Sequence, residues 1–116
     1  MSNFAPKRTS YGTGDTRWLR NALAAQSRDA TVTTSSFASG HIGSDGLVKS
    51  GTPLASGGPG LLRNDLVIKA GEKHLVAVVV GGSPVDRRYL PHALTFEQEA
   101  ALTAIPFING IAPTEG

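Results

Sequence analysis

Two apolar runs in the middle of the chain predict much of its β structure. In DLVIKAGEKHLVAVVVG, residues 66–69 and 74–80 are largely aliphatic and β-branched, and AGEK separates them. Such a split favours a β-hairpin, although periodicity alone also allows a buried helix for either run. Residues 31–37 (TVTTSSF) carry β-branched residues in alternation, and residues 40–60 offer several turn sites in quick succession. The pattern therefore predicts a fold that is mainly β with short helices.

The C-terminal part of the chain predicts one well-defined helix. Thr95 is a good N-cap, and Gln98 three residues later completes a capping-box pattern. Pro106 ends the helix, because proline disfavours helical backbone in the residue before it. We expect two or three turns, roughly 16 Å in length. This helix would pack as a lid on the β core, and IPFI (105–108) would leave it as a final strand.

The N-terminal part of the chain has a different composition. Residues 1–16 are rich in Ser, Thr, Gly and Asn with few apolar anchors, a composition that buries too little surface to offset the entropy of ordering. In TRWLRNALAAQ (16–26), apolar residues at spacings of one, three and four predict a short helical turn. We therefore expect a flexible, extended arm at 1–28 and a β-rich domain at 29–116 with the capped helix near its C-terminal end.

Charge follows the same division. Residues 1–28 hold five basic side chains against Asp15, a net charge of +4. Residues 29–116 hold six basic side chains against eight carboxylates, a net charge of −2. A basic leading segment of this kind usually contacts a partner.

The bulk composition narrows the class of protein. A chain of 116 residues is expected to form one domain, and 14 Gly, 7 Pro and 40% hydrophobic residues indicate many turns and a modest core. There is no Cys, so neither a disulfide nor a thiolate metal site is available. No apolar run reaches 18 residues and none resembles a signal-peptide core, so we expect a soluble protein that is not secreted and has no membrane partner.

Candidate catalytic chemistry is sparse. His41, His74 and His92 are the histidines, and none lies four residues from another or beside a close carboxylate pair. SGGPG (56–60) lacks the Lys-Ser/Thr ending of a P-loop, and no GxSxG motif is present. A Ser-His-Asp enzyme stays open but unsupported. We expect no enzyme, no catalytic or metal-binding residue and no cofactor.

The basic residues leave two interpretations open. Arg17, Trp18 and Arg20 interleave cations with an aromatic ring, as single-strand-binding surfaces do. The charge is thin for a nucleic-acid-binding protein, and an arm anchored in a protein groove is the favoured alternative. Arg87 and Arg88 beside Asp86 allow two interpretations, a phosphate contact or a solvated rim with a local ion pair, of which the rim is favoured.

Several motifs in order resemble a known family. They are KSGTPLA (49–55), HLVAVVVGG (74–82) and VDRRYLPHALTFEQEAALTAIPFI (85–108). Together they resemble the head decoration proteins of tailed bacteriophages, the family that includes the lambda-type decoration protein. GDTRWLRNA (14–22) is also similar to the tryptophan-containing leader of the actinobacterial-phage branch.

The resemblance implies a small β-clip-like domain that assembles as a homotrimer. Such trimers bind the major capsid protein on the outer surface of the expanded phage head, at three-fold and quasi-three-fold positions, and cement the shell. The protein would be made in the host cytoplasm and reside in the virion, with no catalysis and no cofactor.

Two sets of residues are expected to carry this role. The first set, in the arm, would contact the capsid: Tyr11, Arg17, Trp18, Leu19 and Arg20. The second set would pack in the core or at the trimer contact: Leu90, Phe96, Leu102, Ile105 and Phe107. Binding of nucleic acid through the basic arm is the alternative function.

Overall fold

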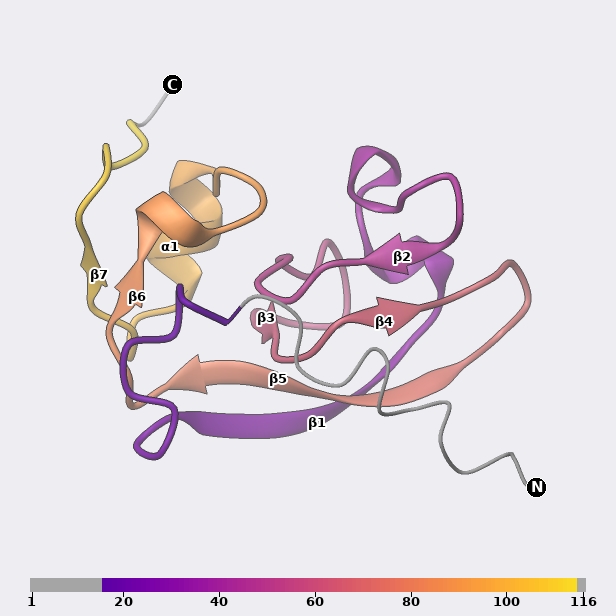
Figure 1. Cartoon of the computed structure of the whole chain (residues 1–116), viewed down its shortest axis with the longest axis horizontal. Helices are drawn as coiled ribbons and strands as arrows, with labels where there is room; N and C mark the ends of the chain where they lie inside the picture. Colours follow the sequence, from indigo (N-terminus) through magenta and orange to yellow (C-terminus); the bar gives the residue numbers. More distant parts are fainter. Residues whose placement is uncertain (1–15, 115–116) are drawn as a thin grey trace.

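The computed structural model describes residues 16–114 and places them in a small domain built mostly of strands (Figure 1). This confirms the mainly β class with few short helices. Short 3-10 helices lie at Thr34–Ser36, Ser39–His41 and Arg87–Tyr89. The other elements, in chain order, are β1 (Gln26–Val32), β2 (Leu47–Val48), β3 (Leu61–Leu62), β4 (Leu66–Val67), β5 (His74–Gly81), β6 (Val85–Asp86), α1 (Phe96–Ala101) and β7 (Phe107–Ile108).

The largest sheet has the order β1-β5-β3, with both neighbours antiparallel to β5. The predicted strand at 31–37 is displaced: β1 begins earlier, at Gln26, and ends at Val32. A 3-10 turn follows, in which the backbone N of Thr33 donates to Ser36 Oγ (3.0 Å). The Thr and Ser side chains of this segment thus bond to nearby backbone and end the strand, as such residues do in turns.

Alternation along β3 and β5 creates two hydrophobic cores. Leu61 pairs with Val79 and Leu62 with Val78, and all four side chains are buried. Neighbouring strand residues point to opposite faces of a sheet, so each pair joins a different cluster. The first core contains Trp18, Leu19, Leu61, Val79, Val85, Leu94, Leu102 and Ile105, and the second contains Ala30, Val32, Phe37, Val48, Leu54, Leu62, Ile68 and Val78.

The predicted hairpin between residues 66–69 and 74–80 is wrong. β4 pairs with β2, whereas both edges of β5 bond to β1 and β3. The chain does turn at AGEK, where Gly71 has φ +86°, but Ile68 then joins Val78 in the second core. Both runs do form strands. Because Ile68 is buried, β4 and β5 face each other across the second core and do not pair as neighbours in one sheet. Figure 1 shows β2 and β4 above one part of the β1–β5 ladder and α1, β6 and β7 at its other end.

The predicted arm at 1–28 is too long, because residues 16–28 belong to the domain. Trp18 is fully buried, Leu19 forms an isolated bridge with Val85, and β1 starts at Gln26. The segment before β1 forms turns and no helix. Its backbone instead bonds to the segment at β6, with Arg20 N donating to the Pro84 carbonyl (3.1 Å). An extended arm can involve only residues 1–15, which lie outside the described part of the chain.

The capped helix is confirmed, although it is shorter than predicted. Thr95 Oγ1 accepts from Gln98 N (3.1 Å), and Gln98 Oε1 accepts from Thr95 N (2.9 Å). The helix ends at Ala101, after about 9 Å, because the chain bends to bury both Leu102 and Ile105 in the first core. The final strand β7 forms as expected and pairs in parallel with β6. Within residues 16–114, no helix is long and apolar enough to cross a membrane.

Candidate interaction surfaces

Trp18 and Leu19, expected to contact a capsid, lie instead inside the domain. Trp18 is fully buried, and its Nε1 donates to Ser50 Oγ (3.1 Å). Gly51, the glycine of KSGTPLA, has φ +94°, and a Cβ there would lie 2.9 Å from Trp18 Nε1. Glycine is therefore required for this close approach. Burial of Trp18 and Leu19 excludes them as a free contact surface; Arg17 and Arg20 are exposed, and Tyr11 lies outside the described residues.

Asp86 ties three distant parts of the chain together. The residue is fully buried, and its backbone N donates to the Trp18 carbonyl (2.8 Å). Its carboxylate accepts from Arg88 Nε and Nη2 (3.1 and 2.9 Å), from Asn109 Nδ2 (2.9 Å) and, at 3.5 Å, from Arg20 Nη1. The Arg88 side chain, more than any other group, holds the pKa of this carboxyl well below its usual range. The carboxylate therefore stays ionised and keeps the three segments together.

Arg87 is not part of a solvated rim, contrary to expectation. Its Nε and Nη2 donate to the two carboxylate oxygens of Glu99 (2.8 and 3.0 Å), and its Nη1 donates to the Asn109 carbonyl (2.9 Å). Both side chains of the ion pair are largely buried, with exposed fractions of 19% and 13%. The guanidinium also lies over the Phe107 ring at 5.6 Å. Arg87 thus fixes α1 to β7, while the expected rim with a local ion pair holds for Arg88 alone.

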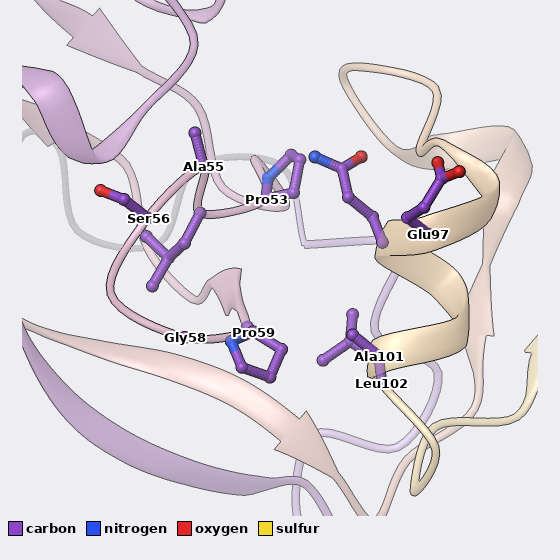
Figure 2. Close-up of a pocket in the computed structure, with 11 residues that line it drawn as sticks. Pro53, Ala55, Ser56, Gly58, Pro59, Glu97, Ala101 and Leu102 are labelled. Carbon is purple, nitrogen blue, oxygen red and sulfur yellow. The ribbon is translucent and has the colours of Figure 1, made fainter.

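One side of α1 borders an apolar groove. None of the six residues of α1 is buried, although the flanking Leu94 and Leu102 are. Figure 2 shows Pro53 and Pro59, from the segment that contains the glycine-rich SGGPG (56–60), on one side of the groove and Ala101 and Leu102 on the other. Its volume is about 260 Å³. The two walls belong to different cores, since Leu54 lies in the second core and Leu102 in the first.

A second groove, of about 320 Å³, lies between the segment that precedes α1, Glu99 of α1 and the C-terminal segment. Its lining includes Leu90, Leu94 and Ile111 together with the Arg87–Glu99 ion pair. Ile111 is 92% exposed, and Phe96, the first residue of α1, is 38% exposed. We call α1, Phe96, Ile111 and the two grooves the α1 surface.

Of the five residues expected to pack in the core or at a trimer contact, four lie in or against the first core and one is exposed. Leu102 and Ile105 are buried in the first core, and Leu90 and Phe107 pack against it while half-buried. Phe96, at 38%, is the most exposed member of this set. The sequence missed Ile111, because nothing local distinguishes an exposed Ile from a buried one.

A basic pocket lies beside the 3-10 helix at 87–89. Its cations are Arg17, Lys49 and Arg88, and Asp65 and Tyr89 also line it. The guanidinium carbons of Arg17 and Arg88 lie 4.7 and 5.3 Å from the centre of the Tyr89 ring. We call this the arginine pocket. Sequence reasoning missed it because the three cations are far apart along the chain and meet only through the packing of Trp18 and Asp86.

Two histidines form a stacked pair at the surface. The rings of His41 and His92 lie 3.9 Å apart at an interplanar angle of 14°. Burial, followed by the neighbouring His41 and Lys49, lowers the pKa of His92. His41 Nδ1 is buried and has no hydrogen-bond partner within residues 16–114. In the same part of the chain, no group of three or more His, Asp or Glu side chains could hold a metal ion.

Comparison of the chain with protein-family models, with curated proteins and with solved structures found no significant match. Function must therefore be inferred from the surfaces of the domain and from the motifs of the sequence.

Proposed function

We propose that this protein is a head decoration protein of a tailed bacteriophage, which binds the outside of the expanded capsid as a homotrimer and stabilises it. It acts by stoichiometric binding to the major capsid protein, without catalysis or a cofactor. The motifs KSGTPLA, HLVAVVVGG and VDRRYLPHALTFEQEAALTAIPFI support the family, and the mainly β architecture agrees with the β-clip-like fold that the family implies. The virion surface is the proposed location.

The α1 surface is the observation that carries the proposal. None of the six residues of α1 is buried, and a largely apolar groove lies on each side of it. Ile111 lines the second groove and is exposed, and Phe96, the first residue of α1, is exposed although it lines neither groove. Apolar patches of this kind on a small domain mark contacts with other proteins. The bidentate Arg87–Glu99 pair holds the helix rigidly, which reduces the entropy cost of binding.

The division of the interior into two small cores also favours association. A small domain without disulfides gains stability when a symmetric oligomer buries further apolar surface. A head-to-tail contact, in which the α1 surface meets a different surface of the next copy, closes into a ring when the rotation is 120°, as a trimer requires.

Nucleic-acid binding through the N-terminal cations, the alternative function, has less support. Arg20 is 3.5 Å from the Asp86 carboxylate, and Arg28 Nη2 donates to the carbonyls of Gly57 and Pro59 (3.0 Å each). Cations that are already bonded within the domain contribute less to a phosphate-binding surface.

The test combines light scattering of the free protein with sedimentation in the presence of expanded capsids. We expect a trimer mass and saturable co-sedimentation. Phe96→Asp should reduce capsid binding or trimer formation by about 30-fold or more, as expected for a hot-spot residue. The new Asp stands at the N-terminus of α1, where a carboxylate is favourable, so the helix should persist.

Leu23→Asp is the matched control, because it makes the same apolar-to-acidic change at a fully exposed position in the turn before β1, outside α1. It should behave as the wild type does. A wild-type protein that stays monomeric and does not sediment with capsids would refute the proposal. Retention on DNA that weakens steeply with salt would favour the alternative.

A further inference from the structure

The arginine pocket combines a positive charge with a concave shape. Arg17, Lys49 and Arg88 line it against one carboxylate, Asp65. Asp65 Oδ1 accepts a hydrogen bond from Ser50 N (2.7 Å), so this carboxylate is held against the wall of the pocket. Arg88 already shares its charge with the buried Asp86, so Arg17 and Lys49 supply most of the positive charge that an entering group meets.

Two of these cations are held in position before any ligand arrives. Arg88 uses Nε and Nη2 to bond to the buried Asp86 carboxylate, while its side chain is still 53% exposed. Both Arg88 and Arg17 lie close to the Tyr89 ring. Guanidinium groups fixed in this way lose little conformational freedom on binding, and their planar geometry suits carboxylates.

The size of the pocket, about 370 Å³, suits one or two side chains of a peptide. Leu47, Tyr89 and Pro91 supply apolar walls that can contact the methylene groups of a Glu side chain. A nucleic acid would need a longer series of phosphate contacts than one pocket with a single carboxylate in its wall provides. The observations therefore favour an acidic peptide over a phosphate backbone.

We infer that the arginine pocket binds a carboxylate-bearing segment of a partner protein, with Arg17, Lys49 and Arg88 contacting its acidic side chains. The identification of that partner as the capsid subunit rests on the proposed function. In that case the arginine pocket would contact the capsid subunit, and the α1 surface would contact a neighbouring copy of this chain.

The test measures binding of a fluorescein-labelled hexaglutamate peptide by fluorescence polarisation at about 50 mM salt, where surface charges are weakly screened. Lys49→Glu should weaken binding about tenfold, because a charge reversal in the pocket replaces attraction with repulsion. Lys49 is exposed, so the variant should remain folded. Arg17→Gln is a second pocket variant and should weaken binding in the same direction.

Lys73→Glu is the matched control, since it makes the same charge change at an exposed position in the β4–β5 turn, outside the pocket. It should leave the affinity within about twofold of the wild type, since it removes only long-range attraction. An equal loss in Lys49→Glu and Lys73→Glu would overturn the inference, because attraction would then be non-specific. Tighter binding of a labelled twelve-residue oligothymidylate than of hexaglutamate would overturn it in favour of nucleic acid.

Capsid sedimentation of the same variants separates this inference from the proposed function. Capsid binding by the wild type and by Lys49→Glu alike, without hexaglutamate binding, would refute the pocket and retain the decoration role. Hexaglutamate binding that depends on Lys49, without capsid binding, would retain the pocket and refute the capsid subunit as its partner. Self-association that Lys49→Glu abolishes, with no peptide binding, would overturn the inference in favour of a second copy as the occupant.

Discussion

Replacement of Trp18 by Ala tests whether the segment before β1 belongs to the domain. The Trp18 side chain is fully buried in the first core, and its Nε1 donates to Ser50 Oγ. An indole in a free arm would be solvated, and its removal would change the free energy of unfolding by less than about 0.5 kcal/mol. A buried Trp18 and a solvated Trp18 therefore predict very different losses in the free energy of unfolding when Trp18 is replaced by Ala.

The magnitude follows from the burial of the indole. A buried Trp removes about 200 Å² from water, and at about 25 cal/mol per Å² this corresponds to about 5 kcal/mol. Ala keeps part of that contribution, so Trp18→Ala should lower the free energy of unfolding by about 3–5 kcal/mol. For a chain of this length the melting temperature should fall by about 12–20 °C, at about 4 °C per kcal/mol.

Urea unfolding followed by far-ultraviolet circular dichroism measures this loss, because the variant lacks the single Trp of the chain. The protein concentration must be equal for all samples, since association adds to apparent stability. Leu23→Ala is the control, because Leu23 is fully exposed, and it should stay within about 0.5 kcal/mol of the wild type. A loss below about 1 kcal/mol in Trp18→Ala, with an unchanged denaturant slope, would refute the burial of Trp18.

Two further predictions concern local interactions. The folded-state pKa of His92 lies below its ordinary value of 6.5, so the unfolded chain binds protons more readily, and stability should fall as the pH drops below about 6.5. His41, Lys49 and Asp45 line the same site as His92. Between pH 7.5 and pH 5.5, the free energy of unfolding measured in urea should fall less in His92→Gln than in the wild type. Equal losses would contradict the assignment of this pH dependence to His92. Thr95→Ala should cost about 1 kcal/mol in urea unfolding through loss of the helix cap, and an unchanged stability would show that the cap contributes nothing.

Local signals in the sequence predicted the elements that depend on neighbouring residues. Thr95 and Gln98 cap α1 as their spacing indicates, because both partners of a capping box lie within one turn. The aliphatic run at 74–80 forms β5, since a β-branched run of this length is stable when both of its edges are paired. Phe107 and Ile108 form a strand where Pro106 prevents the helix from continuing.

The predictions of a free arm and of a hairpin were wrong because both depended on contacts between distant residues. Composition could not show that Trp18 reaches Ser50, 32 positions later, and so the basic segment was expected to be free. The hairpin prediction assumed that neighbouring runs pair, whereas burial of Ile68 gives β4 a different partner. The arginine pocket brings Arg17 and Arg88 to one tyrosine, which only the folded chain reveals.

The two proposed binding surfaces share one short structural element. Arg87 and Arg88 are consecutive residues of the 3-10 helix that follows β6, and Arg87 binds Glu99 of α1 while Arg88 borders the arginine pocket. Asp86, at the N-cap of that element, is buried and fixes Arg88 together with Asn109 beside β7. Hydrogen bonds and ion pairs of residues 86–88 thus connect the α1 surface to the arginine pocket. Under the proposed function, these bonds would help both surfaces to bind at once, because avidity is lost when the geometry prevents simultaneous contacts.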